Sequence, residues 1–176
     1  MLLMKLGPED KVIANILLAR NLATSLGASS RALSPKSDRI RFHQIRRLAK
    51  AILIGGESYR NEPYSHLSLP LYIASRTLIE GAIGNQFIFN KDPAWLINRA
   101  LLDTGAPVLI EGGVKFISEP IAQRLIDLLY ITRVNEDGDG HFFDENNLLN
   151  NYERQSLEVI DGTIFESWRV KLKSSN

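Results

Sequence analysis

The sequence predicts an α/β fold, with a largely parallel central sheet and an antiparallel hairpin near the C-terminus. Short apolar runs alternate with helical patterns until about residue 134. Beyond that point, residues 157–170 hold two alternating stretches joined by Asp161-Gly162, a pair typical of tight hairpin turns. The chain has 176 residues, 44% of them hydrophobic and 23% charged, so we expect one domain over residues 1–176.

The predicted strands are short apolar runs bounded by turn residues. The first run is also long enough for a helix, so its residues alone leave both possibilities open. In the third run, Pro70 stands near the start, where a missing N–H is tolerated. The runs expected as strands are 12–19, 51–56, 69–76, 86–90, 107–113 and 127–134.

A first helix is predicted over residues 38–50, after a loop at 20–37 that is rich in serine, alanine and glycine. Its apolar residues roughly share one face, as in a helix that packs on a core. Either Ser37 or Asp38 has a side chain suited to capping its first turn.

Two further helices are predicted, and proline and glycine mark positions at their ends or within them. Asp92 as N-cap, Pro93 in the first position and Gly105 at the end delimit one of them. The other covers residues 114–126 and is expected to be helical on both sides of Pro120.

The composition argues against several classes of partner and site. The chain has 21 basic and 20 acidic residues, which gives a net charge of +1. A charge this small creates no overall field that would attract nucleic acid or an anionic membrane. The absence of cysteine excludes disulfides and thiolate metal sites. The three histidines lack metal-ligand spacing, and the acidic segment 135–146 lacks the spacing of a calcium loop. We expect no metal site, and a surface turn at 135–146.

No apolar run reaches the about 18 residues that span a membrane. The apolar start of the chain meets Gly7-Pro8 and acidic residues at once, which is too short for a signal peptide. We therefore expect a soluble, cytoplasmic protein.

Two pairs of glycines end predicted strands, Gly55-Gly56 and Gly112-Gly113. Ligands of open α/β sheets bind beyond the carboxyl ends of the strands, and glycine lets a ligand approach the backbone closely. A helix that starts there offers free N–H groups to a phosphate. Either pair alone is better explained as an ordinary turn, but two pairs at like positions favour a phosphate-bearing cofactor.

Ser75-Arg76 follows another predicted strand. A hydroxyl beside a guanidinium suits a phosphate monoester, although a surface loop with a solvated arginine is the favoured explanation from spacing alone. Glu111 follows three apolar residues. It could hold or pass a proton with a raised pKa, or it could cap the helix after Gly113, and the residues do not decide between the two.

The chain resembles the dihydrofolate-reductase-like superfamily, and more closely the pyrimidine reductase (C-terminal reductase domain) of riboflavin biosynthesis. The resemblance rests on the order of motifs in residues 29–64, 69–78, 105–116 and 125–134. They include a Ser-Arg loop before an Asp-x-x-x-Phe helix, a glycine turn after an apolar strand, and an apolar–Glu-Gly-Gly signature. It implies a dihydrofolate-reductase-like three-layer fold and an NADPH-dependent reductase of a ribosylaminopyrimidine-type substrate, in which NADPH carries the redox chemistry.

The resemblance also implies roles for individual residues. The cofactor's phosphates would lie at the turn of Gly55, Gly56, Glu57 and Ser58 and at the second turn of Gly112, Gly113, Val114 and Lys115. The 2′-phosphate that distinguishes NADPH would lie at Ser75 and Arg76. Glu111 would be the catalytic acidic residue near nicotinamide and substrate, and Asn15, Arg31 and Arg60 would contact the substrate. Relatives are often homodimers, and the C-terminal hairpin offers a sheet edge that a second copy could cover.

The chain departs from the family in the loop after the first strand. The family's Ser-x-Asp-Gly motif falls on residues 19–22 without gaps, or on 25–28 in a shifted alignment, and its aspartate is missing in both. At best Asn21 replaces it as a substrate contact, and an amide can form hydrogen bonds but carries no charge. The turn Asn61-Glu62-Pro63 also stands where many relatives have Asp-Asn-Pro. A non-catalytic nucleotide-binding module on the same fold, or a reductase of a different, pterin-like substrate, therefore remains an alternative.

Overall fold

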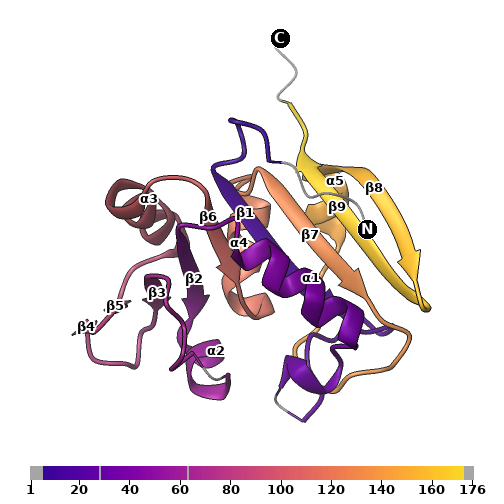
Figure 1. Ribbon diagram of the computed structural model, residues 1–176, viewed down its shortest axis with the longest axis horizontal. Helices are drawn as coiled ribbons and strands as arrows, with labels where there is room; N and C mark the ends of the chain where they lie inside the picture. The colour runs from indigo at the N-terminus through magenta and orange to yellow at the C-terminus, as the bar shows by residue number, and fades with distance from the viewer. Residues whose placement is uncertain (1–5, 28, 63, 173–176) are drawn as a thin grey trace.

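The computed structural model describes residues 6–27, 29–62 and 64–172. Residues 1–5, Ala28 of the shifted alignment and Pro63 of the turn motif lie outside these ranges, so the expectations that involve them are not addressed. The strands in Figure 1 are β1 (Val12–Leu18), β2 (Ala51–Gly55), β3 (Leu71–Ala74), β4 (Gly81–Ile83), β5 (Gln86–Phe89), β6 (Val108–Glu111), β7 (Leu128–Arg133), β8 (Tyr152–Ile160) and β9 (Thr163–Val170). The helices are α1 (Lys36–Arg46), α2 (Gly56–Asn61), α3 (Pro93–Thr104), α4 (Val114–Ala122) and α5 (Asn146–Asn151), with a 3-10 turn, η1 (Ser30–Ala32).

All these strands belong to one sheet with the order β4-β5-β3-β2-β6-β1-β7-β9-β8. The six from β5 to β7 run parallel, as expected for strands linked by helical crossovers. β4 pairs antiparallel with β5 at one edge. At the other edge, β9 pairs antiparallel with β7 and β8 with β9. The predicted fold class, a mostly parallel sheet with a C-terminal antiparallel hairpin, is confirmed.

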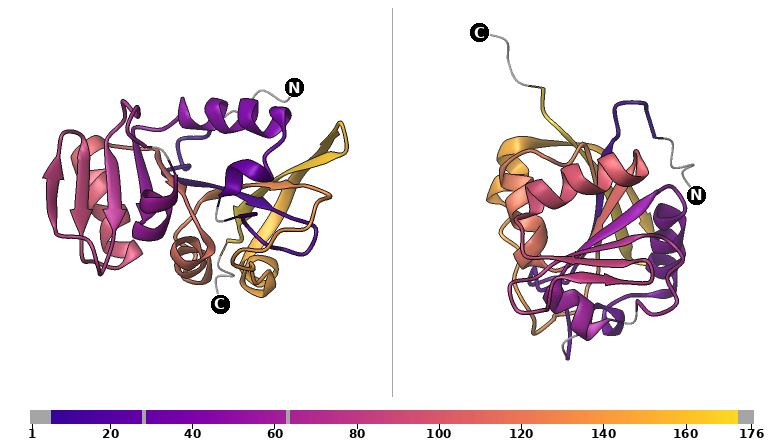
Figure 2. Two further views of the ribbon diagram at one scale, coloured as in Figure 1. Left: turned by 90° about the horizontal axis from the view of Figure 1, so that it is seen from below. Right: turned by 90° about the vertical axis from the view of Figure 1, so that its left-hand side faces the viewer.

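The sheet is the middle of three layers. One face packs against α3, α4 and α5 through the largest apolar cluster, which includes Ala14 of β1 and Ile110 of β6. The opposite face is covered by α1, whose Ile45 packs against Ile13 and Leu109. Figure 2 shows α1 on one side of the sheet and α4 and α5 on the other. Since successive side chains of a strand point to opposite faces, Asn15 lies on the same side as α1.

The signals for α3 and the hairpin are confirmed in their details. The Asp92 carboxylate accepts a hydrogen bond from the Trp95 amide, Pro93 stands in the first turn, and the helix ends at Gly105 with φ of 80°. Asp161-Gly162 joins β8 to β9, and both residues have positive φ. α4 runs through Pro120 without interruption.

The expected cap of the first helix is wrong. α1 begins at Lys36 with Pro35 as N-cap and no capping side chain, so it starts before Ser37 and Asp38. Asp38 lies in the first turn, where a carboxylate interacts favourably with the helix dipole, and accepts a hydrogen bond from the Ser34 hydroxyl.

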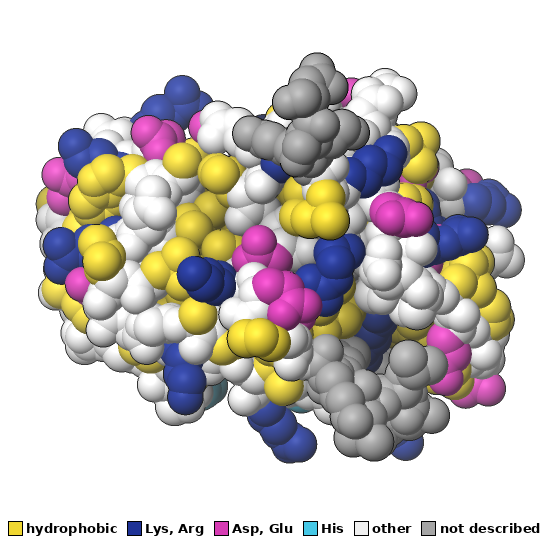
Figure 3. All heavy atoms as spheres, turned by 90° about the horizontal axis from the view of Figure 1, so that it is seen from above, with side chains coloured by type: hydrophobic (Ala, Val, Ile, Leu, Met, Phe, Trp, Pro, Cys, Tyr) yellow, Lys and Arg dark blue, Asp and Glu magenta, His cyan; other side chains and the backbone are white. Residues whose placement is uncertain are grey.

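One face of the molecule carries charges of both signs. Figure 3, seen from above relative to Figure 1, shows acidic and basic side chains interspersed with apolar patches on this face. Within the described ranges, no helix is long and apolar enough to cross a membrane. The same part of the chain holds no cluster of three or more acidic, histidine or cysteine side chains that could bind a metal.

Candidate functional site

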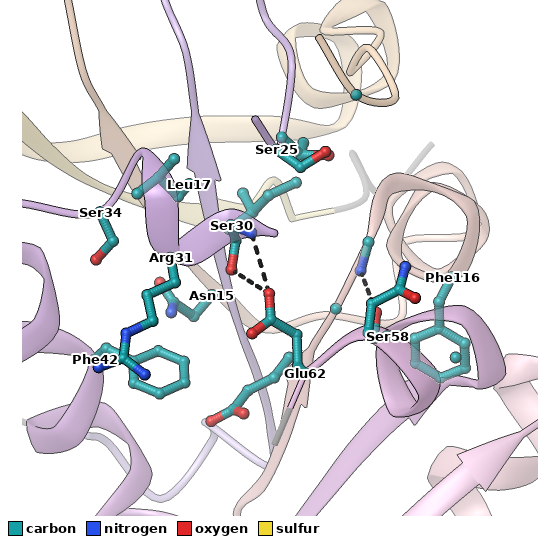
Figure 4. Close-up of a pocket in the computed structure, with 18 of the residues that line it drawn as sticks. Asn15, Leu17, Ser25, Ser30, Arg31, Ser34, Phe42, Ser58, Glu62 and Phe116 are labelled. Carbon is teal, nitrogen blue, oxygen red and sulfur yellow. Dashed lines mark hydrogen bonds between the residues drawn. The ribbon is translucent and has the colours of Figure 1, made fainter. Parts of the chain in front are cut away.

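A cleft of about 710 Å³ opens where β1, β2 and β6 lie side by side. Asn15, Gly55 and Glu111 contribute from these three central strands, and α1, α2 and the start of α4 form the walls. Figure 4 shows side chains of η1, α1 and α2 facing one another across it. The cleft therefore lies at the carboxyl ends of parallel strands, where ligands of open α/β sheets bind.

The two glycine turns meet in this cleft. The Gly113 amide donates a hydrogen bond to the Ser58 hydroxyl over 3.1 Å, which joins the start of α4 to α2 (Figure 4). A Cβ added at Gly112 would lie 3.6 Å from the Ser58 Oγ and 3.8 Å from the Gly55 amide nitrogen. A Cβ at Gly55 would lie 3.2 Å from the Cβ of Phe116, closer than side chains normally approach. The bare backbone of Gly55 therefore lets Phe116 of α4 pack closely on the first turn, whereas a Cβ at Gly112 would make ordinary contacts.

A second polar cluster lies next to the first turn, on the far side of Gly56. A Cβ at Gly56 would come within 2.6 Å of the Ser75 hydroxyl, so only glycine leaves room there. The Ser75 Oγ accepts hydrogen bonds from the backbone amides of Thr77 and Leu78, and the Arg60 guanidinium donates to the Thr77 hydroxyl over 3.3 Å. Arg76, next to Ser75, is exposed. Ser75, Arg60 and Thr77 form one polar turn outside the cleft lining.

The deepest charged pair of the cleft joins Arg46 of α1 to Glu111 of β6. The guanidinium donates two hydrogen bonds, from Nε to Oε1 and from Nη2 to Oε2, each 2.6 Å long. The Glu111 side chain is only 3% exposed, so both of its oxygens are removed from water and held by one partner. The Arg46 guanidinium also stacks on Phe42 at 4.3 Å and lies 5.6 Å from the Tyr64 ring, which restricts its orientation.

Burial and pairing act against each other in this pair. Burial raises the pKa of Glu111, and the hydrogen bonds and charge of Arg46 reduce that rise without cancelling it. For Arg46, burial lowers the pKa, but the contacts with Glu111 outweigh burial and its pKa is raised. Burial also raises the pKa of Tyr64, and the charge of Glu111 adds to the rise. The outcome is a tight ion pair beside a phenol that stays protonated.

The opposite wall holds Arg31 and a carboxylate that fixes its loop. Arg31, in η1, extends toward Phe42 (Figure 4), and no acidic partner for its guanidinium is found among the residues that the structure describes. One Glu62 oxygen accepts hydrogen bonds from the Ser30 amide (3.0 Å), the Ser30 hydroxyl (2.9 Å) and the Ser29 hydroxyl (3.3 Å). Glu62 therefore ties η1 to the end of α2 and sets the position from which Arg31 enters the cleft.

The loop after β1 is joined to the loop after β7. The Asn21 amide donates to the Gly138 carbonyl (2.9 Å), and its oxygen accepts from the Gly138 amide (3.1 Å). The Ser25 carbonyl accepts from the amides of Asp139 and Gly140. A Cβ at Gly138 would lie 2.5 Å from the Ser25 carbonyl oxygen and 2.8 Å from the Ala23 Cβ, so glycine is required for this contact. The two loops form one layer at the mouth of the cleft.

A polar network of Glu57, Lys115 and His141 closes the outer end of the cleft. The Glu57 carboxylate accepts one hydrogen bond from Lys115 Nζ at 3.0 Å and lies 2.9 Å from His141 Nε2. Glu57 lies in the first turn of α2, Lys115 in the first turn of α4, and His141 in the loop after β7. These half-exposed side chains hold the β7 loop against the glycine turns.

The structure brings most of the predicted site residues together. The cleft is lined by Asn15, Arg31, Gly55, Glu57, Ser58, Glu111, Gly112, Gly113 and Lys115. The predicted residues outside its lining are Asn21, Gly56, Arg60, Ser75, Arg76 and Val114. Of these, Asn21 uses its amide to join two loops, and Arg60 lies at the Ser75 turn, although the resemblance placed both at the substrate.

The cleft residues without an assigned role in the sequence include Phe42, Arg46, Glu62 and His141. His141 lies 84 residues from its partner Glu57, and Arg46 lies 65 residues from Glu111. Spacing along the chain carries no signal for such contacts. For Phe42, the resemblance to the reductase family gave a signal, because this residue is the Phe of the Asp-x-x-x-Phe helix motif.

The chain was compared with known proteins in sequence and in structure. No protein-family model matches the chain, and no curated protein matches it in sequence. Among solved structures, a protein from Shewanella sp. PV-4 assigned to riboflavin biosynthesis is similar with a TM-score of 0.72 at 17% identity, over 92% of this chain and 99% of that one. A diaminohydroxyphosphoribosylaminopyrimidine deaminase/5-amino-6-(5-phosphoribosylamino)uracil reductase from Thermotoga maritima is similar with a TM-score of 0.70 at 14% identity, over 92% of this chain.

The fold is dihydrofolate-reductase-like. The chain spans 56% of the length of the Thermotoga maritima enzyme, so the activities of that whole protein are not transferred by the likeness. At these identities the comparison establishes the fold alone, and the function must be argued from the site.

Proposed function

We propose that the chain is an NADPH-dependent reductase acting on a ribosylaminopyrimidine-type substrate. The observation that carries the proposal is the meeting of two glycine turns at one cleft, with a polar arginine-bearing turn directly beside them. Backbone amides at the start of α4 and the ammonium of Lys115 suit a pyrophosphate. Arg76 and Arg60, with the hydroxyls of Ser75 and Thr77, suit one further phosphate.

The residues present fit a dinucleotide. Glycine at positions 55 and 112 lets the two turns lie side by side at the cleft, so that their backbone can line a bound dinucleotide. When bound, NADPH supplies the hydride, which the protein's own side chains cannot provide. The chain's part is to bind and orient both partners in the cleft.

At the substrate end, Arg31 offers a guanidinium without an acidic partner in the described ranges, and Asn15 offers a side-chain amide on the sheet floor. A phosphate group on Arg31 and a pyrimidine edge on Asn15 would match these two groups. Glu111 and Arg46 form a fixed pair beside them. We assign Glu111 the role of orienting the reacting end of the substrate, with Arg46 holding the carboxylate in place.

Cofactor titration tests the proposal. NADPH and NADH are titrated into the protein while tryptophan fluorescence and melting temperature are followed. NADPH should bind and should raise the melting temperature more than NADH does. Replacing Arg76 by Ala should weaken NADPH by about tenfold, the loss of one charge-assisted contact of about 1.4 kcal/mol, and leave NADH nearly unchanged.

Arg99→Ala serves as the matched control, because Arg99 lies in α3 and pairs with Asp103 on the surface. Equal losses for NADPH and NADH in Arg76→Ala would contradict the assigned role of Arg76. Indifference of the wild-type protein to both nucleotides would remove the proposed function.

One observation favours a second candidate, a non-catalytic nucleotide-binding module. Both oxygens of Glu111 are engaged by Arg46, and the amide of Asn21 is consumed by Gly138, so two groups expected near the substrate have protein partners. This candidate predicts NADPH binding with no oxidation when a ribosylaminopyrimidine phosphate or a pterin is added. NADPH consumption with the first compound supports the reductase, and consumption only with the second assigns a pterin-like substrate.

We further propose a homodimer in the cytoplasm. The edge strand β8 carries exposed Leu157 and Val159, and a second copy could cover this edge. Light scattering gives the mass directly, and a monomer at micromolar concentration would contradict the dimer.

A further inference from the structure

Glu57 places a negative charge where the proposed function requires a phosphate. Its carboxylate lies 3.0 Å from the Lys115 ammonium, and Lys115 is the only cationic side chain in the first turn of α4. The two glycine turns lie directly beside this pair, because Ser58 of α2 accepts the hydrogen bond of the Gly113 amide. An anion bound to the backbone amides at the start of α4 and to Lys115 would lie next to the Glu57 carboxylate.

Two like charges cannot share one ammonium at no cost. Hydrogen bonds from His141 and then Lys115 lower the pKa of Glu57, so its carboxylate is ionised at neutral pH. A phosphate that approaches Lys115 must therefore displace Glu57 or tolerate its repulsion. The side chain can move, because it is 43% exposed and lies at the mouth of the cleft rather than in the core.

We propose that the Glu57 carboxylate is a placeholder for the phosphate of the ligand, and that a bound pyrophosphate displaces it from Lys115 and thereby releases His141. This inference rests on the phosphate cradle of the proposed function. It adds that the cradle of the free protein is already occupied by an anion of its own.

Displacement of the Glu57 carboxylate would also affect residues outside the α2 turn, because its partner His141 belongs to the loop after β7. That loop is joined to the loop after β1 by Asn21 and Gly138, by Ser25 with its amide partners, and by the ion pair of Arg20 with Asp137. Glu57 is one point at which this layer is held to α2 and α4, besides the contact of Glu62 with Ser29. Its release removes the contact of the β7 loop with α2 and so loosens that side of the layer when the cofactor arrives.

Binding measurements test the competition. NADPH and inorganic pyrophosphate are titrated calorimetrically into the wild-type protein, Glu57→Gln and Glu153→Gln. Glu57→Gln keeps the size of the side chain but removes its charge, and should bind both ligands about fivefold more tightly, as expected for the loss of a half-exposed competing ion pair. Glu153→Gln makes the same charge change on the exposed part of β8 and should bind like wild type.

The histidine ring resonances test the release. In NMR spectra, the ring signals of His141 should differ between wild type and Glu57→Gln, while those of His66 should coincide. Saturating wild type with pyrophosphate should move the His141 signals toward their position in Glu57→Gln.

The outcomes separate the two proposals. If wild type binds NADPH but Glu57→Gln binds it equally or more weakly, or if the His141 signals ignore bound pyrophosphate, the placeholder role is overturned and the reductase proposal stands. If no variant binds either ligand, the phosphate cradle itself is refuted. Tighter binding together with the shift of His141 supports the inference.

Discussion

Replacing Arg46 by Met would leave the Glu111 carboxylate buried without its partner. Met has a similar length and fills much of the same space against Phe42, so the change chiefly removes charge and hydrogen bonds. The Glu111 side chain is 3% exposed and that of Arg46 22%, so the carboxylate cannot regain water without local rearrangement.

The expected loss follows from this burial. Removing one partner of a buried ion pair costs about 3–5 kcal/mol, and the partial exposure of Arg46 places this case near the lower end, about 3 kcal/mol. For a chain of this length each kcal/mol corresponds to about 2–4 °C, so the melting temperature should fall by roughly 6–12 °C. The double variant Arg46→Met, Glu111→Met should recover most of this loss, since apolar residues often replace a buried pair without penalty.

The loss should depend on pH in a defined direction. Burial already raises the pKa of Glu111, and without Arg46 nothing opposes that rise. A raised carboxyl pKa means that the folded protein binds the proton more tightly than the unfolded chain. The penalty is therefore absent below the unfolded pKa of about 4.3 and grows as pH rises through the folded pKa. The deficit of Arg46→Met relative to wild type should be smaller near pH 5 than near pH 8.

Urea unfolding at both pH values measures the deficit. Arg99→Met is the control, because its pair with Asp103 is about half exposed and should contribute less than about 1 kcal/mol. A loss for Arg46→Met no greater than that of Arg99→Met, or a deficit that shrinks toward pH 8, would refute the account of Glu111 as a buried charge held by Arg46.

Three further substitutions test the other parts of the site and fold. Glu62→Ala should speed amide exchange of Ser30 at least tenfold, because the Glu62 carboxylate accepts that hydrogen bond, and unchanged exchange would contradict the clamp on η1. Gly138→Ala should lower stability by about 1–3 kcal/mol in thermal unfolding because its Cβ would overlap the Ser25 carbonyl oxygen, whereas a neutral effect would show that the two loops are not packed together. Asp92→Ala should cost about 1 kcal/mol through loss of the cap of α3, and Asp92→Asn should restore most of it.

The sequence carries good information about the fold, because the fold depends on local patterns. The apolar runs that became β1, β2, β6 and β7 lie in the middle of the sheet, and burial on both faces demands continuous apolar residues. The edge strand β4 has three exposed residues and no such pattern, so nothing in its composition distinguishes it from a turn. α2 and α5 have six residues each, too few for a helical period to be recognised.

The cleft was only partly predictable. Glycine pairs at strand ends are a local signal with a physical reason, and Gly55, Gly112 and Gly113 do line the cleft. Arg46 is one of several arginines in α1, and only the packing of the helix on β6 selects it to meet Glu111. Arg41, five residues earlier, instead donates to backbone carbonyls of β7 and β9 and stacks on aromatic rings.

The segment 135–146 shows how composition can mislead about importance. Acidic residues and glycines are typical of a solvated turn, and the turn is indeed largely exposed. Its glycines, however, are required by contacts with Ser25 and Ala23, and its histidine reaches Glu57 across the cleft. These partners come from distant parts of the chain, so the constraint is invisible until the loops are placed.

Because β1, β2 and β6 supply the floor of the cleft from residues 12–18, 51–55 and 108–111, no short segment of the chain contains the whole binding surface. Binding of a ligand in the cleft should therefore stabilise the domain against global unfolding, rather than against local fraying of one segment. A ligand at a hundred times its dissociation constant would add about 2.7 kcal/mol to the free energy of unfolding. Melting temperatures measured in the presence of each member of a nucleotide library would therefore reveal binding, because the whole domain unfolds cooperatively, and no assay of turnover is needed.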